Sequence, residues 1–289
     1  MPFDVTLQDL RQTVEFAYRT TPLYQQLYQR KPVIRSFEDF IGLPIVTDEV
    51  VRRAGGLLEC LSVRDIRSPH SVLCELNPFS GVASSFPYTP VENETDCEYR
   101  YVRVEAMLKY AGLEKRELLI LADQPNMYFA ADLEHVLFNY AIAIILCDGV
   151  PADELAGIAA LLQPRSIVVM TSAPIPPEVI PASCRRILTF CNFRSYPART
   201  PFRVFDVYST HALPWVGIRS QNEVAYRSNE LFLDDEGELE VQVHLEKGKN
   251  GHLLVTVIAD NERSPLLPLV RFDTGDQVES VDGSRFVIP

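Results

Sequence analysis

A carboxylate near the end of the chain, Asp276, stands in a pattern that could bind a ribose. It follows the apolar run Pro268–Val270 and closes the sequence Arg271-Phe-Asp-Thr-Gly-Asp276. A strand that runs into Thr-Gly-Asp places its last carboxylate on a tight turn, facing outward. A fixed carboxylate can accept hydrogen bonds from both hydroxyls of one ribose, and charge-assisted hydrogen bonds of this kind are strong. Taken alone, the same residues are also typical of a plain β-turn.

The middle of the chain alternates between helix and strand patterns. A long helix is predicted from about Glu94 to Tyr110, and Gly112 ends it. The other predicted segments are the strand 117–122, the helices 131–140 and 153–162, and the apolar runs 141–146 and 166–170. Continuous apolar strands between amphipathic helices indicate a mostly parallel sheet covered on both faces. Ligands of such sheets bind beyond the carboxyl ends of the strands.

Capping residues divide the N-terminal part into short helices. Thr6 stands three residues before Asp9, and Leu10, Val14 and Ala17 then recur at helical spacing. Three further helices are predicted to begin near Pro22, Ser36 and Thr47.

The last third of the chain reads as strands joined by turns. The predicted strands are 203–208, 230–233, 238–245 and 252–259, and Gly248–Gly251 is one of two good hairpin connections. The Pro-, Arg- and Ser-rich segment 174–203 is interpreted as a long surface connection. We therefore predict an α/β fold with a helical N-terminal segment (1–75), an α/β subdomain (76–205) and a β-rich subdomain (206–289).

Composition narrows the classes of function. The chain has 289 residues and a net charge of -12. We expect no binding to nucleic acid, because Lys and Arg side chains would have to neutralise the phosphates. Its longest apolar run, 140–147, is too short to span a bilayer, and we expect no membrane association. The six cysteines are scattered without a Cys-x-x-Cys pair, so we expect a reduced, cytoplasmic protein without a zinc site. The sequence contains no Gly-x-Gly-x-x-Gly motif after a strand, so a Rossmann enzyme is not favoured. It also lacks the Gly-x-Ser-x-Gly motif of a serine hydrolase.

Several segments together resemble the adenylate-forming enzymes, in particular the phenylacetate–CoA ligase-like branch. "RFDTGD" is similar to the family signature "RYRTGD", and "TPLYQQLY", "SFEDF" and "LPIVTDEVVR" follow one another as in the family's N-terminal entry. The resemblance implies the fold of the family's N-terminal core and an activity that joins a carboxylate to AMP before a thiol, usually of CoA, captures the acyl group. It assigns Arg271, Thr274 and Asp276 to the ribose motif. The family's mobile lid would begin where this sequence ends, at Pro289, so we expect the lid and its lysine to be absent.

The family's phosphate loop is altered in this sequence. The matching stretch, Phe79–Pro87, keeps Ser80 and Gly81 but has Val82 and Ala83 where the family has hydroxyl side chains. Hydroxyls and exposed N–H groups hold phosphate oxygens, so the loop is either a changed phosphate site at Ser80 and Gly81 or a plain loop.

The adenine and magnesium motif is altered as well. Its counterpart is Tyr208-Ser-Thr-His-Ala212, in which Tyr208 would stack on adenine as the family tyrosine does. The metal-binding glutamate falls on Ala212, and a methyl group cannot coordinate Mg²⁺, so we expect no metal at this site. His211 is a candidate general base near neutral pH, although a lone histidine is more often a simple polar side chain.

Three functions stay open. The first is a divergent protein that binds an acyl or aryl carboxylate, adenylate or thioester in a biosynthetic ligation or acyl-transfer step, with ATP or AMP as the nucleotide. The second is a split ligase whose lid comes from a separate polypeptide. The third is a non-catalytic binding or scaffold protein with a protein partner, and the family also suggests a homodimer. Because a fold transfers more safely than an activity, and the phosphate and metal groups are altered, we do not expect this chain to complete adenylation alone.

Overall fold

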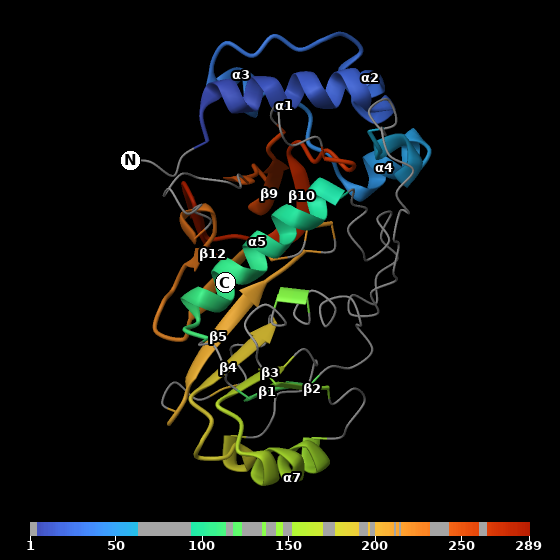
Figure 1. The fold of residues 1–289 in the computed structure, drawn as a ribbon. Helices are drawn as coiled ribbons and strands as arrows, with labels where there is room; N and C mark the ends of the chain where they lie inside the picture. Colours follow the sequence, from blue (N-terminus) through green and yellow to red (C-terminus); the bar gives the residue numbers. More distant parts are fainter. Residues whose placement is uncertain are drawn as a thin grey trace.

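The computed structural model describes most of the 289-residue chain, and the layers of the fold can be followed in Figure 1. The residues described are 5–62, 94–113, 118–122, 135–136, 143–146, 152–169, 177–190, 196, 200–210, 212–213, 215–231, 243–259 and 265–289.

Helices form the N-terminal layer, as the sequence predicts. They are α1 (Leu7–Thr20), α2 (Pro22–Tyr28), α3 (Phe37–Ile41), α4 (Asp48–Ala54) and the 3-10 turn η1 (Leu57–Cys60). Thr6 and Asp9 exchange side-chain and backbone hydrogen bonds at the start of α1, and Ser36 and Asp39 do the same at α3. These capping boxes satisfy N–H groups that the first helical turn leaves without partners. The predicted apolar stripe of α1 is buried.

The main sheet combines parallel and antiparallel strands in the order β11-β12-β7-β6-β5-β4-β3-β1-β2. Its parallel part contains β1 (Leu118–Ala122), β2 (Ala143–Leu146), β3 (Ser166–Val169), β4 (Arg186–Phe190) and β5 (Arg203–Tyr208). Its antiparallel extension contains β6 (Gly217–Ser220), β7 (Tyr226–Arg227), β11 (Ser280–Asp282) and β12 (Arg285–Val287). The mostly parallel sheet predicted from apolar strands is thus confirmed.

Helix α5 (Glu94–Tyr110) crosses one face of this sheet (Figure 1). Its Met107 and Leu108 share a buried apolar cluster with Leu188 of β4, Phe205 of β5 and Trp215. Alternate residues of a strand point to opposite faces, so Asp206 and Tyr208 of β5 lie on the other side. The remaining helical elements are α7 (Ala152–Leu162) and the 3-10 turns η3 (Pro177–Val179) and η5 (Asn229–Leu231).

A separate antiparallel sheet carries the candidate turn. It consists of β8 (Val243–Lys247), β9 (His252–Val257) and β10 (Phe272–Gln277), with β9 in the centre. The predicted hairpin between β8 and β9 is present, closed by a 2.9 Å bond from Gly251 N to Gly248 O. The N-terminal helices cover this sheet, and Val46 joins it directly because its backbone pairs with Arg271 and Asp273 at 3.1 and 2.9 Å.

Two expectations about the chain differ from the structure. The segment 174–203 is not a surface connection throughout, since β4 lies inside it and pairs with both β3 and β5. The predicted strand at 230–233 begins instead in the 3-10 turn Asn229–Leu231. The predicted boundary between the α/β subdomain and the β-rich subdomain, at 205/206, falls within β5. Residues 63–93 and most of the predicted helix 131–140 lie outside the described residues. None of the helices found among the described residues has the length and hydropathy of a membrane span.

Candidate functional site

The sequence predicts a tight turn after a strand at Thr274–Asp276, but these residues lie inside β10, where they form a bulge. We call this bulge the turn of β10, and its own side chains fix it. Gly275 has a φ of +82°, a conformation that glycine adopts at little cost. Thr274 is buried, and its hydroxyl donates to Leu253 O at 3.1 Å while accepting from Asp276 N at 3.1 Å. The register between β9 and β10 shifts between Asp273 and Gln277. The resulting bulge turns the exposed Asp276 away from the ladder.

Tyr208 meets Asp276 where the two sheets come together. Its hydroxyl donates to Asp276 Oδ2 at 2.6 Å. Tyr208 is the last residue of β5, so this contact lies at the carboxyl end of a parallel strand, where ligands of such sheets bind. Within the described part of the chain, the other carboxylate oxygen, Oδ1, accepts no hydrogen bond. Asp276 therefore offers an exposed, fixed acceptor at this edge.

The ring of Tyr208 is enclosed by aromatic neighbours. It is 4% exposed and contacts Phe286 edge-on, with ring centres 5.1 Å apart, and Tyr226 at 5.7 Å. Phe286 in turn stacks on Tyr226 at 5.1 Å. Tyr208 thus presents no open ring face in this structure, and stacking of adenine on it requires a side chain to move.

A row of buried polar groups lies behind this aromatic cluster. Asp206, which is 1% exposed, accepts hydrogen bonds from Tyr226 Oη at 2.5 Å and Thr189 Oγ1 at 3.1 Å. The guanidinium of Arg219 lies 4.3 Å above the Tyr226 ring and 3.7 Å from the Asp206 carboxylate. Asp206 holds the Tyr226 hydroxyl and Arg219 covers one face of the Tyr226 ring. These contacts fix the ring against which Tyr208 and Phe286 pack.

Arg271 is turned inward, behind the candidate turn. Its buried guanidinium donates to Glu246 Oε1 at 2.6 Å and to the carbonyl of Leu43. Its backbone has a φ of 52°, uncommon for a residue with a side chain, and its N–H donates to Thr256 Oγ1 at 2.9 Å. In this arrangement, Arg271 clamps the N-terminal segment to β8 and β10.

The loop that joins β5 to β6 is tightly pinned. Val216 N donates to Tyr208 O at 2.9 Å, and Trp215 N donates to Ser209 Oγ at 3.0 Å. Trp215 is fully buried with a φ of 55°. Ala212, the residue at the expected glutamate position, is buried and offers only a methyl group. Among the residues that the structure describes, no cluster of His, Cys, Asp and Glu could hold a metal ion.

The predicted site residues are therefore distributed unevenly. Tyr208, Thr274 and Asp276 come together, whereas Arg271 lies just before β10 and its side chain points inward to Glu246. His211, Ser80 and Gly81 fall outside the described residues.

A polar cluster that the sequence does not single out braces the turn from behind. Asp273 accepts hydrogen bonds from Gly275 N at 2.9 Å and Asn250 Nδ2 at 3.0 Å. His252 Nδ1 lies 3.0 and 3.1 Å from its two oxygens. The contact depends on the pairing of β9 with β10, and the only local signal is that Asn250 and His252 flank the hairpin residue Gly251.

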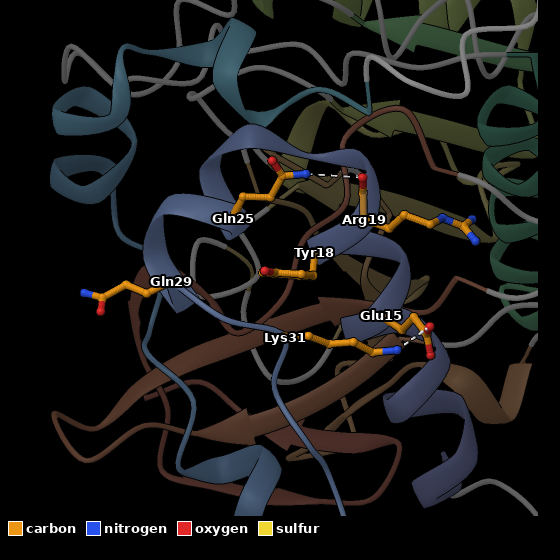
Figure 2. Close-up of a pocket in the computed structure, with 6 residues that line it drawn as sticks. All are labelled: Glu15, Tyr18, Arg19, Gln25, Gln29 and Lys31. Atoms are coloured by element: carbon orange, nitrogen blue, oxygen red, sulfur yellow. Dashed lines mark hydrogen bonds and ion pairs between the residues drawn. The ribbon is translucent and has the colours of Figure 1, made fainter.

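A hollow of about 570 Å³ lies elsewhere, over α1 and α2 (Figure 2). It is lined by Glu15, Tyr18, Arg19, Gln25, Gln29 and Lys31. Lys31 pairs with Glu15 at 2.6 Å, and Gln25 donates to Arg19 O at 3.3 Å. None of the predicted site residues lines this open, polar hollow, and we assign it no role.

Comparisons with known proteins identify the fold. Neither the protein-family models nor the curated proteins give a match to this sequence. An open conformation of 2-hydroxyisobutyryl-CoA ligase, in complex with 2-HIB-AMP and CoA, is similar with a TM-score of 0.62 and 15% identity, covering 98% of this chain and 72% of the ligase. Its thioesterification state gives 0.59 and 14% (98% and 66% covered), and its postadenylation state with 2-HIB-AMP gives 0.61 and 15% (98% and 65% covered).

This likeness shows the fold alone, and it is the predicted α/β fold, the one that the N-terminal core of these ligase structures has. The chain spans between 65% and 72% of the length of these ligase structures.

Proposed function

We propose that this chain binds an acyl or aryl adenylate, or the nucleotide part of one, with the ribose hydroxyls on Asp276. The exposed Asp276 carboxylate carries the proposal, because two buried side chains hold it in place: Thr274 of the same turn and Tyr208 at the carboxyl end of β5. The similar ligase structures contain 2-HIB-AMP, an adenylate. ATP or AMP is accordingly the proposed nucleotide, and a small carboxylate or its thioester is the proposed substrate class.

The surrounding residues fit a nucleotide better than a magnesium ion. Asp276 keeps one carboxylate oxygen without a hydrogen bond among the described residues, and a ribose hydroxyl can donate to it. Ala212 supplies no oxygen, whereas Mg²⁺ requires several oxygen ligands. We therefore propose a role in a biosynthetic ligation or acyl-transfer step that does not depend on magnesium held at Ala212.

The remaining predicted groups enter as part of this proposal. Ser80 and Gly81 are the proposed contacts to phosphate, and His211 is the proposed general base. The phosphate contacts come from the resemblance to the phenylacetate–CoA ligase-like branch, and the general base comes from the chemistry of a histidine next to Ala212. Single substitutions of Ser80 and His211 test them against the same ligands.

The experiment is a calorimetric titration of the full chain with AMP, ATP·Mg²⁺ and a stable acyl-adenylate analogue. Asp276→Ala is the test variant, and Asp282→Ala, which removes an exposed carboxylate of β11, is the matched control. We expect binding in the wild type and the control and a loss of about 10- to 100-fold in Asp276→Ala, from the usual worth of hydrogen bonds to a charged group. Equal affinities in all three proteins would contradict the proposal.

A second function, a non-catalytic binding or scaffold protein, is favoured by the enclosed ring of Tyr208. The ring is 4% exposed, so the family's adenine contact is closed in this structure. If none of the three ligands binds, this second function becomes the better account, and a protein partner should be sought by pull-down from the source cells.

A further inference from the structure

We infer that His252 is a positioning residue for Asp276, acting through Asp273 and the backbone of Gly275. The inference rests on the proposed nucleotide binding and deepens it, since it names a residue that sets how well Asp276 receives the ribose hydroxyls.

The first step is the bond between His252 and Asp273. A single ring nitrogen, Nδ1, lies 3.0 and 3.1 Å from the two oxygens of the Asp273 carboxylate. An ionised carboxylate only accepts hydrogen bonds, so His252 donates to Asp273 in the tautomer that carries a proton on Nδ1. The Asp273 side chain is 9% exposed and that of His252 is 27% exposed, which shields the pair from solvent in part.

The second step links Asp273 to the backbone of the turn. Asp273 Oδ1 accepts from Gly275 N at 2.9 Å, immediately before Asp276. Asn250 Nδ2 donates to the other oxygen at 3.0 Å, and it lies 2.9 Å from His252 Nδ1. The carboxylate of Asp273 therefore connects the hairpin between β8 and β9 to the turn of β10 by hydrogen bonds.

The third step is the direction of each side chain. His252 stands opposite Gln277 in the ladder, so these two residues share a face. Asp276 has a different neighbour, since its carboxylate meets Tyr208 at 2.6 Å. His252 thus braces the turn from behind, and we assign it no contact with the ribose. Its effect on binding is the pre-organisation of the Asp276 carboxylate, which lowers the ordering cost of binding.

The test measures how much the ribose hydroxyls contribute to affinity. AMP and 2′,3′-dideoxy-AMP are titrated into the wild type, His252→Leu, His252→Asn and Asp273→Asn. The wild type is expected to prefer AMP by about 10- to 100-fold. His252→Leu and Asp273→Asn are expected to reduce this preference by about tenfold, while binding of the dideoxy nucleotide stays the same. His252→Asn retains an N–H donor close to the position of Nδ1 and is expected to restore most of the preference.

The outcomes separate the two claims. A wild type that binds both nucleotides equally overturns the proposed ribose contact and, with it, the role of His252. A wild type that prefers AMP, with the same preference in His252→Leu, overturns the positioning role alone. A loss that His252→Asn fails to restore also contradicts it, since general packing would then explain the effect. If His252→Leu does not fold, Asp273→Asn decides the question, because it preserves the size of the side chain and an oxygen for Gly275 N.

Discussion

Tyr208 and Asp276, 68 residues apart in the sequence, share a 2.6 Å hydrogen bond that joins the carboxyl end of β5 to the turn of β10. The bond occupies one oxygen of the carboxylate proposed to receive the ribose, and the tyrosine ring is closed off by Phe286 and Tyr226. The same contact that completes the site therefore also competes with its ligand.

Removing the Tyr208 hydroxyl should expose this competition. In Tyr208→Phe, Asp276 no longer has to release a partner, so we expect AMP to bind about two- to tenfold more tightly, the equivalent of one ordinary hydrogen bond. Tyr110→Phe is the matched control, because its hydroxyl binds Glu223 instead and its ring packs in the other apolar cluster, so its loss should leave the affinity unchanged. Weaker binding of AMP to Tyr208→Phe would show that the hydroxyl contacts the nucleotide rather than blocks it.

Removing Arg271 should destabilise the fold. Arg271→Met leaves Glu246 partly buried without its guanidinium partner, and we expect a loss of about 3–5 kcal/mol in the free energy of unfolding. Adding Glu246→Leu removes the stranded carboxylate, so the double variant should be more stable than Arg271→Met. Urea unfolding measures both values, and a double variant that is less stable than Arg271→Met would contradict the clamp described for this residue.

The close packing of the Phe286 ring against residue 217 requires a glycine there. A Cβ at this position would lie 2.9 Å from both the Arg227 carbonyl oxygen and the Phe286 ring. We therefore expect Gly217→Ala to cost about 1–3 kcal/mol in thermal or urea unfolding, as overpacking does. Gly157→Ala in α7 is the control. A Cβ there meets nothing within 4 Å, and a gain of about 0.5–1 kcal/mol is expected from helix propensity. Equal effects at the two glycines would contradict the tight packing under Tyr208.

Glu223 should make stability depend on pH in the acid range. Burial opposes its ionisation, but hydrogen bonds from Ser220 N, Tyr110 and Arg227 outweigh it and lower the pKa of Glu223 from 4.5 to about 2. A carboxyl group with a lowered pKa in the folded state contributes stability above its unfolded value, and this is lost as the pH falls through the folded pKa. The stability advantage of the wild type over Glu223→Gln should therefore be full above about pH 4.5 and shrink toward pH 2.

The measurement for this prediction is urea unfolding of both proteins at several values of pH. Glu49→Gln serves as the control, since Glu49 forms an exposed pair with Arg53 and should show a much smaller dependence. A difference between wild type and Glu223→Gln that stays constant over the acid range would contradict the assigned hydrogen bonds.

Local signals in the sequence predicted much of the fold. The capping boxes at Thr6 and Ser36 and the helix Glu94–Tyr110 depend on residues within a few positions of one another, and the structure confirms them. Strand β4 was not predicted, because its five residues lie within a segment rich in Pro, Arg and Ser. Its identity as a strand depends on pairing with β3 and β5, which no local pattern records.

The site was predictable only in its outline. The motif from Arg271 to Asp276 indicated a presented carboxylate, but it could not say which side chains of the turn point inward. The register shift between Asp273 and Gln277 decides this, and it depends on β9. For the same reason, no local pattern predicts the contact of His252 with Asp273 or the hydrogen bond between Tyr208 and Asp276.

The most direct test of the central claim is a side-by-side titration of the wild type and Asp276→Asn with AMP. Asparagine preserves the size of the side chain but removes its charge and one acceptor oxygen. We predict measurable binding to the wild type and an affinity about 10- to 100-fold lower for Asp276→Asn, with a thermal stability close to that of the wild type because the asparagine oxygen can still accept the hydrogen bond from Tyr208. Equal affinity for AMP in the two proteins, or no binding to either, would contradict a ribose site at Asp276.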